Sequence, residues 1–152
     1  MNISQCMKRN VVYIPATSTI REAAGVFVKA HVGLLPVVDQ DRKLVGVVGL
    51  RELLALQLPD FINFVTDVDF VHDFGAVETT HPPASVLDDS IQTLMKPAIT
   101  VQEDSGLLRA YALMLQQDLH DMPVVSEDGT LVGVASRVDI GTKILSAWAE
   151  VV

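Results

Sequence analysis

Hydrophobic and polar positions follow the same order twice along this chain. In the first half, apolar residues recur at helical spacing after Thr19, which with Glu22 has the form of a capping box. In the second half, an equivalent stripe follows Ser105. The apolar positions are Ile20, Ala23, Ala24 and Phe27 in the first stripe, and Leu107, Ala110, Tyr111, Met114 and Leu115 in the second. The two stripes predict two equivalent amphipathic helices.

Each predicted helix is followed by a β-rich run, a polar turn, a second strand and a closing helix. The Asp128-Gly129 pair in the later turn is a strong hairpin signal, because glycine readily accepts a positive φ. The turns, second strands and closing helices are predicted, in that order, at 39–42, 44–48 and 51–56 and again at 126–129, 131–135 and 138–148. Each half is therefore predicted to fold as strand, helix, hairpin and helix.

Short identical sequences confirm that the two halves are copies. Leu-Val-Gly-Val occurs at 44–47 and 131–134, each time eight residues downstream of Pro-Val-Val, which gives an offset of 87 residues. Met7 and Lys8 fall on Met95 and Lys96 at an offset of 88, so one single-residue gap reconciles the whole alignment. The chain is a tandem duplication. We expect a first repeat at 1–56, a connector at 57–90 and a second repeat at 91–152.

Composition narrows the classes of function. The net charge of −8 disfavours nucleic acid as a partner, since phosphate binding needs clustered Lys and Arg. The chain has no run of about 20 apolar residues, and residues 1–10 lack the apolar core of a signal peptide, so we expect a cytoplasmic protein with no membrane span. Cys6 is the lone cysteine, which excludes an internal disulfide.

The apolar content is high for the size of the chain. Hydrophobic residues make up 49% of a 16.5 kDa chain, and the mean hydropathy is +0.36. A small monomer has a large surface for its volume and needs a more polar exterior. We therefore expect a buried partner surface, most simply that of a homodimer.

The start of the last helix carries a resemblance to a known family. The strand at 131–135 runs into Ser136-Arg137-Val138-Asp139. This resembles the cystathionine β-synthase (CBS) domain, whose signature is a strand ending in Gly, two hydrophobic residues and Thr/Ser-x-x-Asp. The resemblance covers both repeats, so the pair resembles a Bateman module. It implies an α/β (α+β) fold of two repeats, each a small sheet with flanking helices, paired about a pseudo-twofold axis with ligand clefts between them. It further implies a flat dimer made through the helices.

The spacing of Ser136, Arg137 and Asp139 has its own chemistry. A serine at a helix start, beside free amides and an arginine, favours a phosphate oxygen. The Asp139 carboxylate can accept two hydrogen bonds, as vicinal ribose hydroxyls require. In the family these positions contact adenosine nucleotides. Ser136 and Asp139 also fit an N-cap and a first-turn carboxylate that only stabilise the helix.

The resemblance implies the rest of a ligand site as well. It assigns an adenine slot to Ala98, Ile99, Thr100, His120, Met122 and Pro123. His120 either stacks on a base or approaches a phosphate, or else it caps the preceding helix near Leu119.

The first repeat departs from this pattern. Gly49, Leu50 and Glu52 stand where the second repeat has Ser136, Arg137 and Asp139. Gly49 can leave amides free and Glu52 can reach a ribose, but the hydroxyl and the positive charge are missing. We expect Gly49 and Glu52 to form a weaker second site.

The stretch between the repeats is unlike either of them. Residues 57–90 hold four of the five phenylalanines, seven acidic residues and no Lys or Arg. Apolar residues at helical intervals between Pro59 and Gly75 predict a linker helix that packs on the module. The alternative is a docking site for another protein. His72 and His81, together with Asp69, Asp73 and Glu78, match no recognised ligand spacing, so we expect no metal site.

The chain carries no nucleophile elbow, Walker loop or zinc-protease sequence, which argues against an enzyme. Our first hypothesis is a regulatory module that requires no cofactor and senses an adenosine-containing metabolite. The candidates are AMP, ADP, ATP and S-adenosylmethionine, with AMP or ADP favoured, and any regulated protein is a separate chain. Our second hypothesis is a non-catalytic assembly module with degenerate ligand sites, acting through its dimer surface and the Phe-rich stretch.

Overall fold

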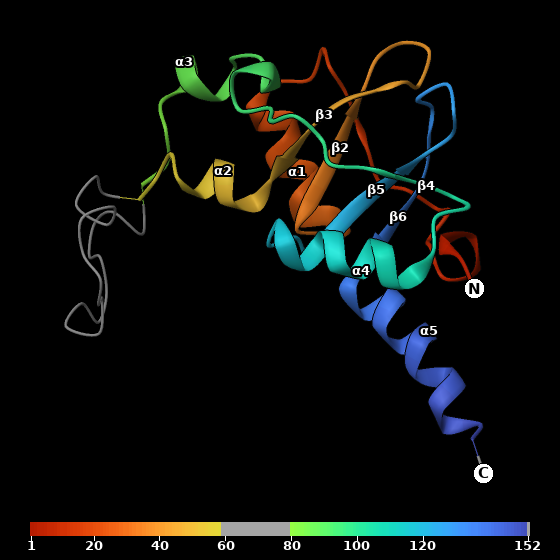
Figure 1. Ribbon diagram of the computed structural model, residues 1–152. Coiled ribbons are helices and arrows are strands. Elements are labelled where there is room, and N and C mark those ends of the chain that lie inside the picture. The colour runs from red at the N-terminus through yellow and green to blue at the C-terminus, as the bar shows by residue number, and fades with distance from the viewer. Residues whose placement is uncertain (59–79, 152) are drawn as a thin grey trace, which may run out of the picture.

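Each half of the chain forms the predicted strand, helix, hairpin and helix (Figure 1). The computed structural model describes residues 1–58 and 80–151. The first repeat contains β1 (Ile14–Pro15), α1 (Ile20–Ala30), β2 (Leu34–Val38), β3 (Leu44–Gly49) and α2 (Leu50–Leu54). The second contains β4 (Val101–Gln102), α4 (Leu107–Gln116), β5 (Asp121–Val125), β6 (Leu131–Ser136) and α5 (Arg137–Ala149). Three short helices complete the described part: η1 (Ile3–Gln5), α3 (Ala84–Leu87) and η4 (Ile91–Thr93).

The two repeats build the same three-stranded sheet. In the first sheet β1 pairs parallel with β2, and β2 pairs antiparallel with β3. The second sheet repeats this order with β4, β5 and β6. Helix α1 begins where predicted, because the Thr19 hydroxyl accepts a hydrogen bond from the Glu22 amide at 3.1 Å. The α/β fold of two sheets with flanking helices is confirmed.

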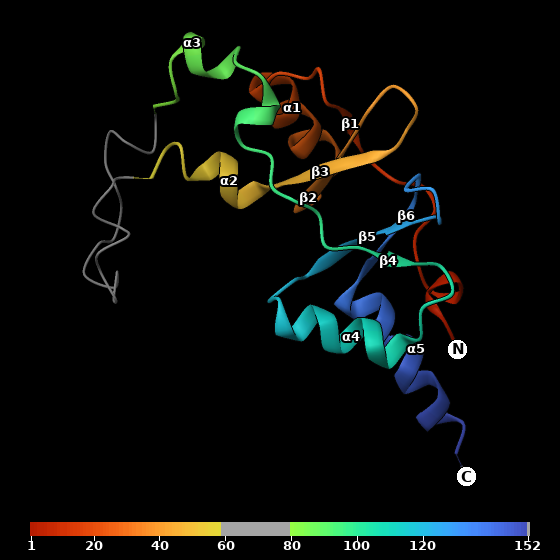
Figure 2. The same cartoon turned by 45° about the horizontal axis from the view of Figure 1, so that its top comes forward.

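Each hydrophobic core takes in a segment from the other half of the chain. Ile3 and Met7 are buried in the core of the second repeat, among Val101, Met114 and Ile140. Ile91 is buried in the core of the first repeat. Figures 1 and 2 show η1 beside β4 and η4 beside α1. The segment before β1 therefore packs in the core of the second repeat, and the segment before β4 packs in the core of the first.

Two glycines allow these exchanged segments to cross the sheets. Lys8 pairs with Val134 through two backbone hydrogen bonds of 2.9 and 3.0 Å, and Lys96 pairs with Val47 through bonds of 2.8 and 2.9 Å. A Cβ on Gly46 would lie 2.8 Å from the Lys96 carbonyl oxygen, and one on Gly133 would lie 2.9 Å from that of Lys8. Any side chain at either glycine would push the crossing segment away.

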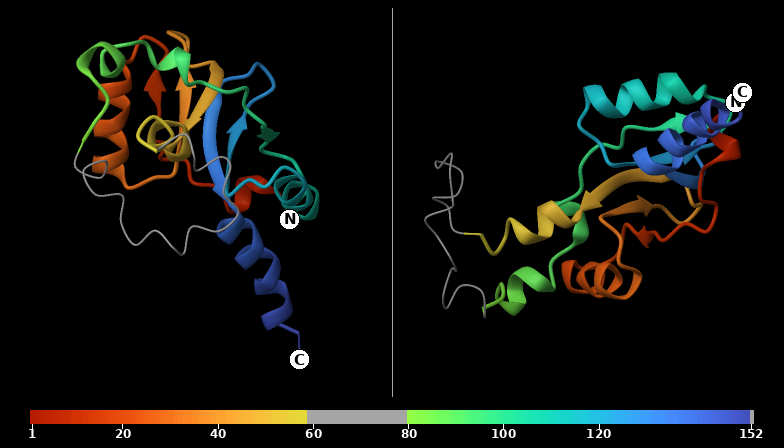
Figure 3. Two further views of the ribbon diagram at one scale, coloured as in Figure 1. Left: turned by 90° about the vertical axis from the view of Figure 1, so that its left-hand side faces the viewer. Right: turned by 90° about the horizontal axis from the view of Figure 1, so that it is seen from below.

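Reciprocal contacts relate the repeats by a pseudo-twofold axis. The Leu44 amide donates to the Gly129 carbonyl at 3.0 Å, and the Leu131 amide donates to the Arg42 carbonyl at 3.1 Å. Lys43 and Thr130, which are equivalent residues, form a β-bridge with each other. The right-hand view of Figure 3 shows α1 and α4 on opposite outer sides, with the sheets between them. The predicted pseudo-twofold pairing is confirmed.

The linker helix predicted between Pro59 and Gly75 lies outside the described residues, as do Asp69, His72, Asp73 and Glu78. Across residues 1–58 and 80–151, no helix is long and apolar enough to cross a membrane. The same residues contain no group of three His, Cys, Asp or Glu side chains arranged to hold a metal ion.

Candidate ligand-binding site

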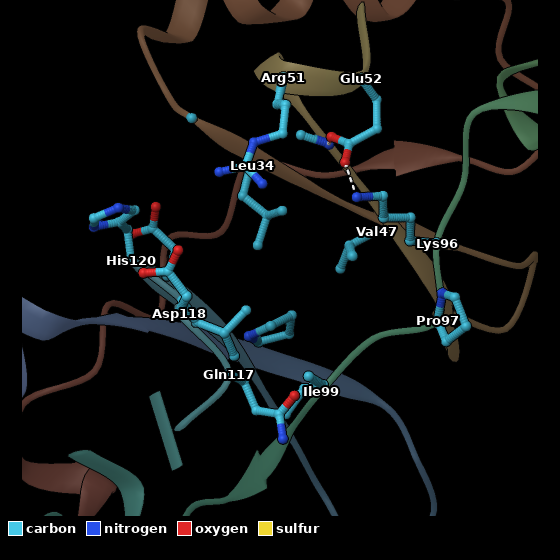
Figure 4. A pocket seen from close by; sticks show the side chains of 15 residues that line it. Leu34, Val47, Arg51, Glu52, Lys96, Pro97, Ile99, Gln117, Asp118 and His120 are labelled. Atoms are coloured by element: carbon cyan, nitrogen blue, oxygen red, sulfur yellow. Dashed lines mark hydrogen bonds and ion pairs between the residues drawn. The ribbon is translucent and has the colours of Figure 1, made fainter. Parts of the chain in front are cut away.

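A pocket of about 410 Å³ lies between the two repeats (Figure 4). Pockets that bind small molecules commonly measure roughly 300–1,000 Å³. One wall is formed by the first repeat, where β3 runs into α2, and the facing wall by the loop between α4 and β5 of the second repeat. The strand-like segment that leads from η4 to β4 closes one side. The pocket is therefore built by three parts of the chain that are far apart in sequence.

Some of the residues predicted to bind a ligand line this pocket together. They are Gly49 and Glu52 from the first repeat and Ile99, His120 and Pro123 from the second. Leu34 and Val47 add apolar surface from β2 and β3. The pocket thus combines residues that the sequence assigned to two different sites.

The other predicted residues lie outside the lining. Met122 is fully buried in the core of the second repeat. Ala98 and Thr100 are half-buried neighbours of Ile99, and Thr100 lines a separate hollow beside β4. Ser136, Arg137 and Asp139 stand at the start of α5, where each has a partner within the protein.

Ser136 and Asp139 form a capping box. The Asp139 amide donates to the Ser136 hydroxyl at 3.0 Å, and the Ser136 amide donates to the Asp139 carboxylate at 3.1 Å. These bonds satisfy free amides at the start of α5. The helix-stabilising interpretation of this pair therefore matches the geometry, and ligand binding here remains a prediction.

Arg137 holds the end of α4. Its Nε donates to the Leu119 carbonyl, and its terminal nitrogen lies 3.5 Å from the Met114 carbonyl and 3.3 Å from the Asp118 carboxylate. Carbonyls at a helix C-terminus lack partners within the helix and carry negative partial charge, so a guanidinium stabilises them. The Arg137 side chain therefore joins α4 to α5.

Glu52 is a largely buried acid of the pocket that has two partners. Its carboxylate accepts a hydrogen bond from the Gly49 amide at 2.9 Å and forms an ion pair with Lys96, drawn as a dashed line in Figure 4. The Glu52 side chain is 14% exposed and that of Lys96 is 57% exposed. Burial by itself raises the pKa of Glu52, but the Lys96 ion pair and the Gly49 amide outweigh it and lower the pKa. Glu52 is therefore a stable anion at neutral pH.

The pocket also holds charged groups that the sequence did not single out. Arg51 and Lys96 bring positive charge, and Asp118 and Asp121 bring negative charge. Among the described residues Arg51 forms no ion pair. Burial raises the pKa of Asp121, nearby Asp139 raises it further, and His120 and Lys8 oppose the rise. Lys96 could have been singled out from the sequence, because the repeated pair Met-Lys occurs at 7–8 and again at 95–96.

His120 lies at the edge of the pocket (Figure 4). Its backbone carbonyl accepts a hydrogen bond from the Arg137 amide at 3.0 Å. Among the described residues, no hydrogen bond is made by its imidazole ring. The ring is exposed and does not cap α4, which leaves it able to face a ligand.

The second repeat has an equivalent but looser ion pair at the start of α5. Lys8 and Asp139 approach to 4.0 Å between Nζ and Oδ1, with side chains that are 72% and 19% exposed. Lys8 crosses β6 as Lys96 crosses β3. The two repeats thus share one arrangement, an acid on the closing helix and a lysine on the crossing segment, held more tightly in the first repeat.

Comparison with known proteins identifies the class. The family model described as CBS domain matches residues 3–58 and 81–145, and the chain belongs to this family. The expected tandem CBS pair is confirmed.

Individual relatives agree with that assignment. The chloroplastic CBS domain-containing protein CBSX1 of Arabidopsis thaliana is 29% identical over 138 residues, which cover 88% of this chain and 58% of CBSX1. The chain thus spans little more than half the length of that relative. Among solved structures, the CBS-pair protein CBSX2 from Arabidopsis thaliana matches with a TM-score of 0.76 and 23% identity, covering 99% of this chain and 98% of CBSX2.

Two related structures contain ligands. A structure of CBSX2 in complex with AMP matches with a TM-score of 0.73, at 23% identity, over 97% of this chain and 98% of CBSX2. The CBS domain pair of protein MJ0100, in complex with 5′-methylthioadenosine and S-adenosyl-L-methionine, matches with a TM-score of 0.68, at 18% identity, over 97% of this chain and 98% of that pair. At these identities the matches establish a shared fold.

Proposed function

We propose that this CBS pair is a non-catalytic regulatory module that binds an adenosine-containing metabolite in the pocket between its repeats. The observation that carries the proposal is the arrangement of the pocket. Apolar side chains of Leu34, Val47 and Ile99 line the pocket together with the carboxylate of Glu52 and the cations Arg51 and Lys96. A base requires an apolar slot, ribose hydroxyls require a carboxylate, and a phosphate requires cations. The adenosine ligands of CBSX2 and MJ0100 support the same ligand class.

The alternative location for the ligand is the second cleft that the family resemblance implies, at the start of α5. Asp139 is mostly buried, and Lys8 lies at the limit of ion-pair distance from it, so this carboxylate is less firmly engaged than Glu52. Binding there would use Ser136, Arg137 and Asp139 with Ala98, Thr100 and Met122. It would require Arg137 to leave the end of α4 before it could meet a phosphate.

Binding is expected to alter how the repeats or their partners pack. Ligands shift an equilibrium only by binding two states with different affinity. The pocket has walls from both repeats and from the segment that follows the connector, so an occupied pocket and an empty one favour different spacings of these parts. A separate protein that senses this spacing would be the regulated partner.

The alternative function, an assembly module, draws on exposed apolar helix surface. Leu108 on α4 is 72% exposed, and Trp148 and Val138 on α5 are 68% and 71% exposed. Such surface is typical of an interface, and a homodimer through these helices is its simplest use. Dimerisation is compatible with ligand sensing. A dimer that binds no adenosine ligand would favour the alternative.

Thermal unfolding with AMP, ADP, ATP, S-adenosylmethionine and NAD tests the proposal. A ligand that binds the folded state at 100 times its Kd adds about 2.7 kcal/mol of stability, which raises the melting temperature. We expect one adenosine ligand to do so saturably. Glu52→Ala should abolish the shift if the ligand binds between the repeats, and Asp139→Ala should abolish it if the ligand binds the second cleft. If no ligand at millimolar concentration shifts the wild-type protein, the sensor hypothesis fails.

A further inference from the structure

Lys96 combines a fixed backbone with a movable side chain. Its amide and carbonyl pair with Val47 at 2.8 and 2.9 Å, which anchors its Cα beside β3. Its side chain is 57% exposed and reaches the Glu52 carboxylate across the mouth of the pocket. Only the flexible side chain needs to move when the ion pair breaks.

Both oxygens of the Glu52 carboxylate are engaged in the structure. Oε2 accepts from the Gly49 amide, and Oε1 pairs with the Lys96 ammonium. The carboxylate is largely buried, so we take the position of Lys96 as the side from which a ribose hydroxyl reaches it. A ribose therefore competes with Lys96 for Glu52.

A displaced Lys96 ammonium needs a new anion. Asp118 is engaged by Arg137 at 3.3 Å, and Asp121 is a half-buried carboxyl whose pKa is raised by burial. An unphosphorylated nucleoside offers no replacement charge, and losing a charge-assisted bond at a partly buried carboxylate is unfavourable. A phosphate at the pocket mouth supplies the missing anion, with Arg51 as a second cation.

We infer that Lys96 is the residue by which this pocket distinguishes a phosphorylated adenosine ligand from the free nucleoside. In the empty pocket Lys96 neutralises Glu52, and in the occupied pocket it moves to the phosphate while the ribose takes its place. The inference rests on the proposed function and adds to it the residue that selects a nucleoside phosphate over the free nucleoside.

Calorimetric titration of adenosine and AMP into wild type and Lys96→Met tests this role. Wild type should prefer AMP. In Lys96→Met, adenosine should bind more tightly, because no cation competes with it, while AMP should bind equally well or more weakly. The ratio of the two affinities should fall by roughly tenfold or more, the effect of one charge-assisted hydrogen bond. Lys29→Met, an exposed lysine on α1, changes the net charge equally and should leave the ratio unchanged.

The alternatives give different results. An unchanged ratio in Lys96→Met, or equal weakening of both ligands, would assign Lys96 a structural role and overturn the inference. A change of ratio in Lys8→Met but not in Lys96→Met would place the ligand in the second cleft, overturning the inference while sparing the proposed function. Absence of binding by either ligand to wild type and variants would overturn both. Lys96→Arg keeps the charge and should keep the AMP preference, which separates charge from folding defects.

Discussion

The two repeats share backbone conformation even where their side chains differ. His31 and Asp118, which are equivalent at the ends of α1 and α4, both adopt left-handed backbone, with φ of 56° and 52°. Arg42 and Gly129, equivalent in the hairpin turns, do so with φ of 63° and 87°. Glycine adopts this conformation without strain and Asp and His adopt it more readily than most residues, whereas Arg42 has no such preference. The duplicated fold thus imposes the geometry, and the side chains are free to diverge.

The starts of the closing helices α2 and α5 show how far the side chains have diverged. The first repeat places Gly49 and Leu50 where the second places Ser136 and Arg137, so one closing helix has a hydroxyl cap and a tether to α4 and the other has neither. The first repeat compensates with a tight ion pair between Glu52 and Lys96. In the second repeat the polar groups of Ser136, Arg137 and Asp139 bond within the protein and stabilise α5. In the first repeat, Gly49 and Glu52 line the pocket between the repeats.

The largest expected effect comes from adding a side chain at the two glycines where the exchanged segments cross the sheets. Gly46→Ala and Gly133→Ala each place a Cβ within 2.9 Å of a backbone oxygen, so we expect each to lower the free energy of unfolding by about 1–3 kcal/mol. Gly46→Ala should cost more, because its Cβ would lie closer to the Met95 side chain than the 2.9 Å that would separate a Cβ on Gly133 from the Met7 side chain. Urea denaturation measures both.

Gly25→Ala is the matched control for these two variants. Gly25 lies inside α1, and an added Cβ would meet nothing within 4 Å. Alanine should therefore stabilise the helix by about 0.5–1 kcal/mol. Loss of stability in Gly25→Ala comparable to that in the other two would contradict the role of close approach.

The next effect separates Arg137 from its counterpart Leu50. Arg137→Met removes charge-assisted bonds to the Leu119 and Met114 carbonyls, so we expect a loss of about 1–2 kcal/mol in unfolding free energy. Leu50 is 42% exposed, and Leu50→Met should change stability by less than about 0.5 kcal/mol. If Arg137→Met were neutral in stability but weakened AMP binding, the arginine would serve the ligand instead.

Hydrophobic periodicity predicted the helices and strands of both repeats, because each repeat buries one face against its own sheet. Periodicity carries no information on which half of the chain supplies a core residue, so the exchange of Ile3 and Ile91 was not predictable. The Asp-Gly signal identified the second hairpin turn, but Arg42 reaches the same backbone without glycine.

The site was predictable only in part, for a related reason. Alignment of the repeats singled out Gly49 and Glu52, and the family resemblance singled out Ile99, His120 and Pro123, but these were assigned to separate sites. They meet because the pseudo-twofold axis brings the end of β3 opposite the loop before β5. Aligning the two repeats shows which residues are equivalent, but it does not show which residues of one repeat contact the other.

A smaller effect is expected from converting one helix cap into the other. Ser136→Ala removes the hydroxyl that accepts the Asp139 amide and should cost about 1 kcal/mol, whereas Ser136→Gly, which copies the first repeat, should cost a few tenths. The reverse change, Gly49→Ser, should bring no stabilisation, since its Cβ would lie 2.5 Å from the Glu52 carboxylate. Thermal unfolding of the three variants measures these differences, and a stabilised Gly49→Ser would refute the proposed crowding.

The smallest effect is a difference in pH dependence between two acids of the pocket, one from each repeat. The folded pKa of Glu52 is lowered, so its stabilisation is present above the ordinary carboxyl value of about 4.3 and is lost as pH falls through the lower folded pKa. Asp121, which stands where the first repeat has Leu34, has a raised pKa because it is buried. Its protonated form is favoured on folding, so its relative stabilisation is present below about 3.9 and is lost as pH rises through the folded pKa.

Glu52→Gln and Asp121→Asn should therefore shift stability in opposite directions at pH 7. Glu52→Gln should destabilise the protein by about 1 kcal/mol or less, as expected for an ion pair with a largely exposed lysine, and Asp121→Asn should stabilise it. Both differences in unfolding free energy from wild type should shrink in acid, because the carboxylates become protonated. Urea denaturation at several values between about pH 3 and pH 7, roughly the range in which carboxyl groups titrate, can follow this change. Parallel shifts in the two variants would mean that the charges of the pocket act on stability as one network across the repeats, and the contrast between a paired Glu52 and a buried Asp121 would have to be abandoned.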